Sequence, residues 1–186
     1  MMPITKKVTR YQPIGDLGPQ IIQLRLMRRS EQVSSARLEQ VIVAEGVQRV
    51  AVHEGDLRGV LVLTATKERR PGVLVVGGSD GGVPLRSAAW LASRGYAALA
   101  LAYFRYEDLP AKLEVIPLEY FEHALIWMTQ RPEILGNRLA VMGTSRGGEL
   151  ALQLGSMFPR IGAVRAYVPA NVRYPACCGG NIVPYD

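Results

Sequence analysis

Along most of the chain, short apolar runs alternate with longer stretches of mixed character. Four runs have the length and composition of buried strands, namely PGVLVVGG (71–78), YAALALA (96–102), RLAVM (138–142) and AVRAYV (163–168). Three intervening stretches have helical character, at 85–93, 117–131 and 149–158. The alanines of 96–102 would suit a helix equally well, but its place in the alternation favours a strand. This alternation predicts a parallel sheet wound by right-handed crossovers, and hence an α/β fold with helices on both faces of the sheet.

The two later helical stretches are amphipathic. The first follows Pro117, and its apolar face is formed by Leu118, Phe121, Leu125 and Met128. In the second, the apolar positions expected to point inward are Leu150, Leu154 and Met157. Each helix therefore has one face that can pack against the predicted sheet.

The first part of the chain lacks helical stretches. Residues 47–53 and 59–66 predict two strands, joined by the turn-rich GDLRG, which would form a hairpin at the leading edge of the sheet. Before them, IIQLRLM (21–27) and ARLEQVIV (36–43) have strand-like patterns. We therefore divide the chain into a β-rich N-terminal part, residues 1–46, and a partial α/β domain, residues 47–186. The first part is either the tail of a separate β-rich domain or an edge added to the α/β domain.

Composition narrows the class of protein. The chain has 186 residues, of which 48% are hydrophobic and 20% charged, as in an ordinary globular protein. No apolar run reaches the ~18 residues of a membrane span. The N-terminal MMPITKKVTR has no apolar segment after it, so we expect a cytoplasmic protein. The adjacent Cys177 and Cys178 predict two reduced thiols, and nothing in the sequence predicts a metal site or a cofactor.

The net charge of +6 comes mostly from scattered arginines. Acidic residues interrupt them, as in EYFEH, and no nucleic-acid-binding motif accompanies them, so no nucleic-acid partner is expected. The surplus is compatible with a phosphate-bearing substrate.

The sharpest chemical signal is a G-x-S-x-G pattern formed by Gly143, Ser145 and Gly147. The pattern stands directly after a predicted strand and directly before a predicted helix, which is the context of a nucleophile elbow. In such an elbow the serine occupies a strained turn, and the helix N-terminus directs its N–H groups at a developing anion. The alternative is a glycine-rich turn in a Rossmann-like domain.

A second glycine-rich segment, GGSDGG (77–82), also follows a predicted strand. In α/β-hydrolases this loop supplies one oxyanion-hole N–H, and the residue after the nucleophile supplies the other. The donors would be Gly78 or Ser79, together with Arg146. The competing interpretation is a phosphate-binding loop, but the segment lacks both the lysine of a P-loop and the G-x-G-x-x-G spacing.

The general base that a serine nucleophile needs is missing from the expected position. In this fold an acid and then a histidine follow the nucleophile. Both histidines, His53 and His123, precede Ser145, and we expect them to be surface or edge residues. The only carboxylate after the last predicted helix is Asp186. We therefore expect the catalytic acid and histidine to lie beyond residue 186, and the chain alone to show little turnover.

The stretch from about Glu45 to Pro184 resembles the acyl-CoA thioesterase and bile acid-CoA:amino acid N-acyltransferase family. The resemblance rests on segments that match in order and spacing: EGVQRVAVHEGDLRGVLVL, GGSDGG, ASRGYAALALAYFRYEDLP, IPLEYFEHALIWM and LAVMGTSRGGELALQLG. It implies a β-sandwich followed by an α/β-hydrolase domain that acts on CoA thioesters. Residues 1–46 would then be the last strands of the sandwich. Most of the sandwich and the last third of the hydrolase domain are absent.

By position, Ser145 matches the family nucleophile. The N-acyltransferase members carry cysteine at this position, so the resemblance implies a serine thioesterase that hydrolyses acyl-CoA. Such an enzyme would act in acyl-CoA or fatty-acid metabolism. Two alternatives remain open. One is a dienelactone-hydrolase-like carboxylesterase, and the other is a non-catalytic hydrolase-fold protein that binds acyl-CoA or a partner protein.

The last predicted strand, 163–168, generates a prediction about association. If the sheet ends there, it has an unpaired edge and an uncovered apolar face, both of which favour association. We expect dimers or larger species in light scattering of the purified chain, and a stable monomer would contradict this expectation.

Overall fold

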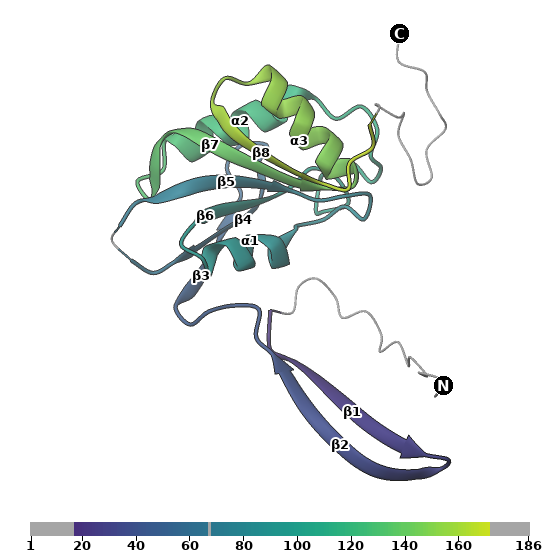
Figure 1. The fold of residues 1–186 in the computed structure, drawn as a ribbon. Helices are drawn as coiled ribbons and strands as arrows, with labels where there is room; N and C mark the ends of the chain where they lie inside the picture. Colours follow the sequence, from purple (N-terminus) through teal and green to yellow (C-terminus); the bar gives the residue numbers. More distant parts are fainter. Residues whose placement is uncertain (1–16, 67, 172–186) are drawn as a thin grey trace.

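A six-stranded, mostly parallel sheet forms the centre of the protein (Figure 1). The structure, a computed structural model, describes residues 17–66 and 68–171. In spatial order the strands are β3 (Val47–Val52), β4 (Arg58–Thr64), β6 (Ala97–Ala102), β5 (Arg70–Val76), β7 (Ile134–Thr144) and β8 (Ile161–Tyr167). Strand β4 is antiparallel to both of its neighbours, while β6, β5, β7 and β8 are mutually parallel. The predicted α/β class and the predicted leading hairpin are both confirmed.

Helices cover both faces of this sheet. Helix α1 (Leu85–Ala92) packs on one face, and α2 (Leu118–Thr129) and α3 (Arg146–Met157) pack on the other (Figure 1). The chain continues from β5 to β6 on one side and later returns to β7 on the other side. Strand β5 is therefore the point at which the strand order reverses, where open α/β sheets place their ligand sites, at the carboxyl ends of the strands.

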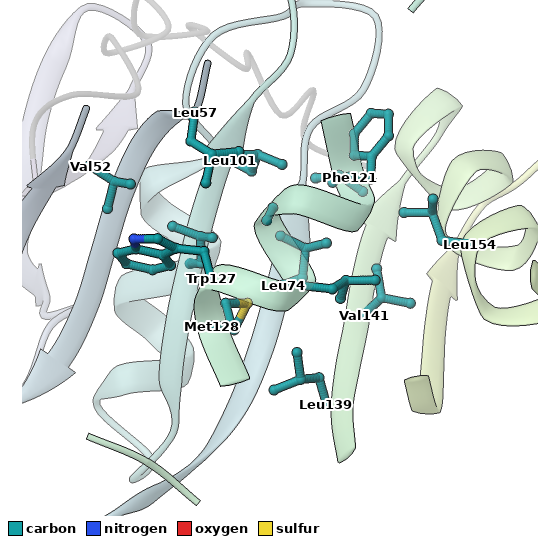
Figure 2. Close-up of a cluster of buried hydrophobic side chains, with 14 of the residues drawn as sticks. Val52, Leu57, Leu74, Leu101, Phe121, Trp127, Met128, Leu139, Val141 and Leu154 are labelled. Atoms are coloured by element: carbon teal, nitrogen blue, oxygen red, sulfur yellow. The ribbon is translucent and has the colours of Figure 1, made fainter. Parts of the chain in front are cut away.

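The central strand β6 explains why both faces can be covered. All six of its side chains are buried, which settles that the alanine-rich run is a strand. Leu99 and Leu101 face α2 and α3, whereas Ala98 and Ala100 face α1. The small alanines leave room for α1, which also presents alanines to the sheet. The larger cluster, on the α2 and α3 face, contains Leu74, Phe121, Met128 and Leu154 (Figure 2).

Strands β1 (Gln20–Arg28) and β2 (Glu31–Gln40) form a separate antiparallel hairpin that extends away from the sheet (Figure 1). The two strands predicted in this region are thus confirmed, with β2 ending at Gln40. The connector after β2 is fixed to α1, since the Ala44 amide donates to Ser93 Oγ at 2.8 Å. The assignment of residues 1–46 to a separate domain stays a prediction.

Two details of the later helices differ from expectation. Helix α3 begins at Arg146, not at 149, because the Gly148 and Glu149 amides already donate to the carbonyl of Ser145. Met157, expected to point inward, is 51% exposed, and Ala151 is buried instead. The helical spacing of apolar residues in α3 extends to Met157, but Met157 lies beyond the part of the helix that packs on the sheet. None of the helices within the described residues is long and apolar enough to cross a membrane.

Helix α3 supplies a matched test of the core. Leu154 is fully buried and Leu152, on the same helix, is 48% exposed. We expect Leu154→Ala to lower the free energy of unfolding by about 2–5 kcal/mol, and Leu152→Ala by less than about 1 kcal/mol. Urea unfolding followed by circular dichroism measures both. Equal losses would contradict the packing of α3 on the sheet.

Candidate active site

Ser145 lies at the carboxyl end of β7, on the turn that leads into α3. Its backbone has φ 56° and ψ −120°, a conformation that non-glycine residues rarely adopt and that carries strain. Its amide donates to the Tyr167 carbonyl at 2.9 Å, which ties the turn to the end of β8. The residue is exposed. The turn therefore presents the Ser145 hydroxyl at the edge of the sheet where β5 reverses the strand order.

The flanking glycines make this turn possible. A Cβ built on Gly143 would lie 1.8 Å from the carbonyl oxygen of Gly147. A Cβ on Gly147 would lie 2.2 Å from the carbonyl oxygen of Gly77. Real Cβ atoms do not approach so closely, so strand β7, helix α3 and the loop after β5 pack together only because both positions lack a side chain.

The second glycine-rich loop lies directly beside Ser145. Val76 is paired with Gly143, so the residues after β5 run next to the residues after β7. A Cβ on Gly78 would lie 3.4 Å from Ser145 Cβ and 3.0 Å from the Thr144 carbonyl oxygen. The Gly81 amide donates to the Gly78 carbonyl at 3.2 Å and closes a turn that contains Ser79. The structure thus brings together two segments that are far apart in the sequence.

Arg146, the third predicted oxyanion donor, is the first residue of α3. Its amide therefore belongs to the helix N-terminus, where N–H groups and the helix dipole favour an anion. Its side chain pairs with Glu149 at 2.8 Å, and both side chains are more than four-fifths buried. The roles of Ser145, Gly78, Ser79 and Arg146 in catalysis stay predictions.

Residues after β6 support the second loop, a role for which no sequence pattern provides a signal. Tyr103, which follows β6, donates its hydroxyl to the Gly77 carbonyl at 2.8 Å. Burial raises the pKa of this hydroxyl well above its ordinary value, so it stays protonated and donates. The Gly82 amide donates to the Phe104 carbonyl at 2.9 Å. Tyr103 and Phe104 are both buried.

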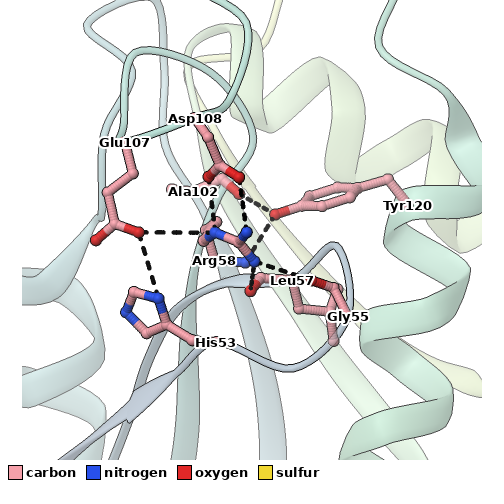
Figure 3. A network of polar contacts seen from close by, with 8 residues as sticks. All are labelled: His53, Gly55, Leu57, Arg58, Ala102, Glu107, Asp108 and Tyr120. Carbon is pink, nitrogen blue, oxygen red and sulfur yellow. Dashed lines mark hydrogen bonds and ion pairs between the residues drawn. The ribbon is translucent and has the colours of Figure 1, made fainter.

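A polar network at the same edge of the sheet holds the β6–α2 connection in place (Figure 3). Arg58, at the start of β4, forms two hydrogen bonds of 2.7 Å with Asp108. This contact lowers the pKa of the Asp108 carboxyl and raises that of the guanidinium. Tyr120 donates to the Ala102 carbonyl at 2.6 Å and accepts from the Arg58 amide at 3.2 Å. The network joins β4, the end of β6 and α2.

Neither histidine is placed to act on Ser145. His53 follows edge strand β3, and its Nδ1 lies 3.4 Å from a carboxylate oxygen of Glu107. Four strand spacings separate β3 from β7, roughly 19 Å at the usual distance between strands. His123 pairs with Asp56 of the β3–β4 turn at 3.1 Å. Both side chains are about half exposed, as expected for surface residues.

The strand order, the two-sided helix packing and the serine turn define an α/β-hydrolase fold. Solved structures agree. A putative dienelactone hydrolase from Klebsiella pneumoniae matches with a TM-score of 0.57 and 19% identity, over 69% of this chain and 62% of that one. The esterase Est22 matches with a TM-score of 0.56 and 17% identity, over 67% of this chain and 44% of that one. These likenesses concern the fold.

The sequence comparisons place the chain within this class. A family model described as "BAAT / Acyl-CoA thioester hydrolase C terminal" matches residues 116–175. Acyl-coenzyme A thioesterase 6 of Mus musculus is 35% identical, over 89% of this chain and 39% of its own length. Bile acid-CoA:amino acid N-acyltransferase of Homo sapiens is 42% identical, over 70% of this chain and 31% of its own length.

The chain belongs to the acyl-CoA thioesterase and bile acid-CoA:amino acid N-acyltransferase family. It spans between about three and four tenths of the length of these curated relatives.

Packing around Gly147 generates the first prediction for this site. Gly147→Ala would place a methyl group against the Gly77 backbone, so we expect a loss of about 3 kcal/mol or more of stability. Gly162→Ala is the matched control, because the nearest atom, 3.2 Å away, belongs to the flexible Arg138 side chain. Thermal unfolding compares them. Similar midpoints for the two variants would refute the close approach of α3 to the β5 loop.

Backbone strain at Ser145 generates the second prediction. Ser145→Gly should raise the free energy of unfolding by about 1 kcal/mol, because glycine adopts φ 56° without steric penalty and part of that gain is offset by its flexibility when unfolded. Ser145→Ala keeps the Cβ and should leave stability nearly unchanged. Chemical denaturation distinguishes the two, and a glycine variant less stable than the alanine variant would argue against a strained turn.

Proposed function

We propose that Ser145 is the nucleophile of an acyl-CoA thioester hydrolase. The observation that carries the proposal is the serine turn itself: Ser145 stands on a strained bend at a helix N-terminus, with Gly78 against it. The substrate class comes from the names of two relatives, acyl-coenzyme A thioesterase 6 and bile acid-CoA:amino acid N-acyltransferase. Both names describe enzymes that act on CoA thioesters.

In the proposed reaction, Ser145 Oγ attacks the thioester carbonyl carbon, and a general base takes the hydroxyl proton. The carbonyl electrons move onto oxygen, where the amides of Arg146 and of Gly78 or Ser79 stabilise the charge. The carbon–sulfur bond then breaks, CoA leaves as a thiolate, and water hydrolyses the acyl-serine to the free acid. We place the base, a histidine oriented by an acid, outside the 186 residues, because neither His53 nor His123 is positioned to reach Ser145.

Serine at position 145 favours hydrolysis over transfer to an amino acid. A serine ester and a cysteine thioester differ in reactivity toward amines and water, and the family resemblance assigns cysteine to the N-acyltransferase members. Tyr103 enters the proposal only as a support of the loop beside Ser145, and Arg58 only as a support of the β6–α2 connection. We propose a cytoplasmic location, although one relative, acyl-coenzyme A thioesterase 2 of Mus musculus, is named as mitochondrial.

A second candidate is a non-catalytic protein that keeps the hydrolase fold and binds acyl-CoA. The observation that favours it is the position of the two histidines: His53 follows β3, four strand spacings from β7, and His123 of α2 pairs with Asp56 of the β3–β4 turn. A third candidate function, compatible with the same serine turn, is that of a carboxylesterase acting on small oxygen esters.

One assay separates these functions. We would extend the reading frame past codon 186, express the resulting protein, and measure CoA release from acyl-CoA with a thiol reagent. We expect turnover that Ser145→Ala reduces by at least about a thousandfold, because the nucleophile is lost, while the 186-residue chain alone stays near background. Activity on an oxygen ester without activity on acyl-CoA would favour the carboxylesterase. Acyl-CoA binding with no turnover and no fluorophosphonate labelling would favour the binding protein.

A further inference from the structure

The hydroxyl of Tyr103 lies at the glycine-rich loop beside Ser145. The Tyr103 side chain is 3% exposed, and its ring packs edge-on against Phe104 and Phe121, with ring centres 5.1 Å and 5.4 Å apart. Its hydroxyl donates to the Gly77 carbonyl oxygen at 2.8 Å. A phenylalanine would make the same ring contacts, so the hydroxyl serves the loop and not the packing of the core.

The peptide that this hydroxyl contacts joins Gly77 to Gly78. In a trans peptide the C=O and the N–H point in opposite directions, and the described residues contain no cis peptide bond. Because the Gly77 carbonyl oxygen points toward the Tyr103 hydroxyl, the Gly78 N–H points away from it. The tyrosine at one end of the peptide therefore fixes the direction of the N–H at the other end.

Helix α3 restricts the same carbonyl sterically. Gly147, in the first turn of α3, lies so close to the loop that a Cβ built on it would overlap the Gly77 carbonyl oxygen. The carbonyl oxygen is thus confined by the helix backbone and receives its hydrogen bond from Tyr103. Both contacts limit how far the peptide can rotate.

The Gly78 amide is close enough to Ser145 to meet a developing anion. Gly78 is half-buried, and a Cβ built on it would lie 3.4 Å from Ser145 Cβ. Across residues 17–66 and 68–171, the Gly78 N–H donates to no backbone carbonyl, while the Gly78 carbonyl accepts from the Gly81 amide. An uncommitted backbone donor beside a serine hydroxyl suits the negative charge that forms when the serine attacks a carbonyl carbon.

Hydrogen bonds in series strengthen one another. A hydroxyl that donates to a peptide carbonyl draws electrons toward the oxygen, and the N–H of the same peptide becomes a stronger donor by about 10–30% per bond. Burial raises the pKa of the Tyr103 hydroxyl, so it stays protonated at neutral pH and keeps donating. The Tyr103 hydroxyl, the Gly77 carbonyl and the Gly78 N–H form such a series, and the series ends beside Ser145.

We propose that Tyr103 is a positioning residue of the oxyanion hole. Its hydroxyl orients and polarises the peptide between Gly77 and Gly78, so the donor from this loop is the Gly78 amide and not the Ser79 amide. The inference rests on the proposed function, because an oxyanion forms only if Ser145 attacks a carbonyl carbon. Tyr103 keeps its proton throughout and acts only through this peptide.

Two buried tyrosines provide a matched pair of variants. Tyr103→Phe and Tyr120→Phe each remove a hydroxyl that donates to a backbone carbonyl, that of Gly77 in the first case and that of Ala102 in the second. Tyr120 also accepts from the Arg58 amide, so its variant should lose at least as much stability. Thermal unfolding measures both. Tyr120→Phe therefore controls for the loss of a buried hydrogen bond away from the glycine-rich loop.

Kinetics of the protein extended past codon 186 give the first readout. We expect Tyr103→Phe to lower kcat for acyl-CoA hydrolysis about tenfold and to change KM less than about twofold, since the oxyanion contact is made in the transition state. Loss of a whole donor costs roughly 10²–10³, but here the Gly78 amide remains. Tyr120→Phe should change kcat less than about twofold. Rates are expressed per reactive serine, counted by fluorophosphonate titration, so unfolded molecules do not contribute.

The Gly78 amide gives a second readout that needs no turnover. A hydrogen bond to the carbonyl of the preceding residue deshields an amide nitrogen, because it polarises the peptide. In nitrogen NMR of the extended protein labelled on glycine, Tyr103→Phe should therefore move the Gly78 resonance upfield. Tyr120→Phe should leave that resonance in place.

An unchanged kcat in Tyr103→Phe, or an equal fall in both variants, would overturn the proposal. A fall in kcat without movement of the Gly78 resonance would also overturn it, because the hydroxyl would then not act through this peptide. The proposed function fails separately. If the extended protein hydrolyses no acyl-CoA, the resonance alone decides: an upfield shift upholds the polarised peptide, and an unchanged resonance refutes it.

Discussion

The close approach of three backbones at Gly147 is the constraint on which the site depends. Strand β7 must end, helix α3 must begin, and the loop after β5 must pass, all within a volume that leaves no room for a single Cβ at Gly143 or Gly147. That contact sets where Gly78 lies relative to Ser145 and obliges Ser145 to adopt a positive φ. The glycines of this turn are therefore required for steric reasons. Any catalytic role of Ser145 depends on the backbone geometry that they allow.

The rest of the fold reinforces this contact from a distance. Alanines on one face of β6 let α1 lie close to the sheet, and leucines on the other face fill the space beneath α2 and α3. At the carboxyl edge, Tyr103 holds the Gly77 carbonyl, and the Arg58 network holds the segment that follows. Position in the sheet thus decides which polar groups hold the loop after β5 and the β6–α2 connection.

Much of this architecture follows from periodicity alone. The six strands of the sheet and three helices are where the alternation of apolar runs predicts them, because buried strands and amphipathic helices have distinct periods. The start of α3 was not predictable in this way, since its first residue, Arg146, is followed by two glycines whose role is steric and not apolar. Met157 has the helical spacing of a core residue and is nevertheless exposed, because a helical period does not reveal where the sheet beneath the helix ends.

The candidate site was predictable only in part. The pairing of the two glycine-rich loops follows from parallel strands that end at one edge. The contribution of Tyr103, Arg58 and Asp108 depends on contacts between elements, which carry no local signal in the sequence.

The position of β5 between β6 and β7 has a consequence for how the protein acquires its structure. The loop after β5 and the turn after β7 become neighbours only after the whole β6–α2 crossover has been laid down between them. Such non-local pairing forms slowly, since the entropy of closing a long loop must be lost before the contact is made. During synthesis on the ribosome, β5 therefore emerges well before its neighbour β7 exists, and its unpaired apolar edge is a surface that a chaperone would bind.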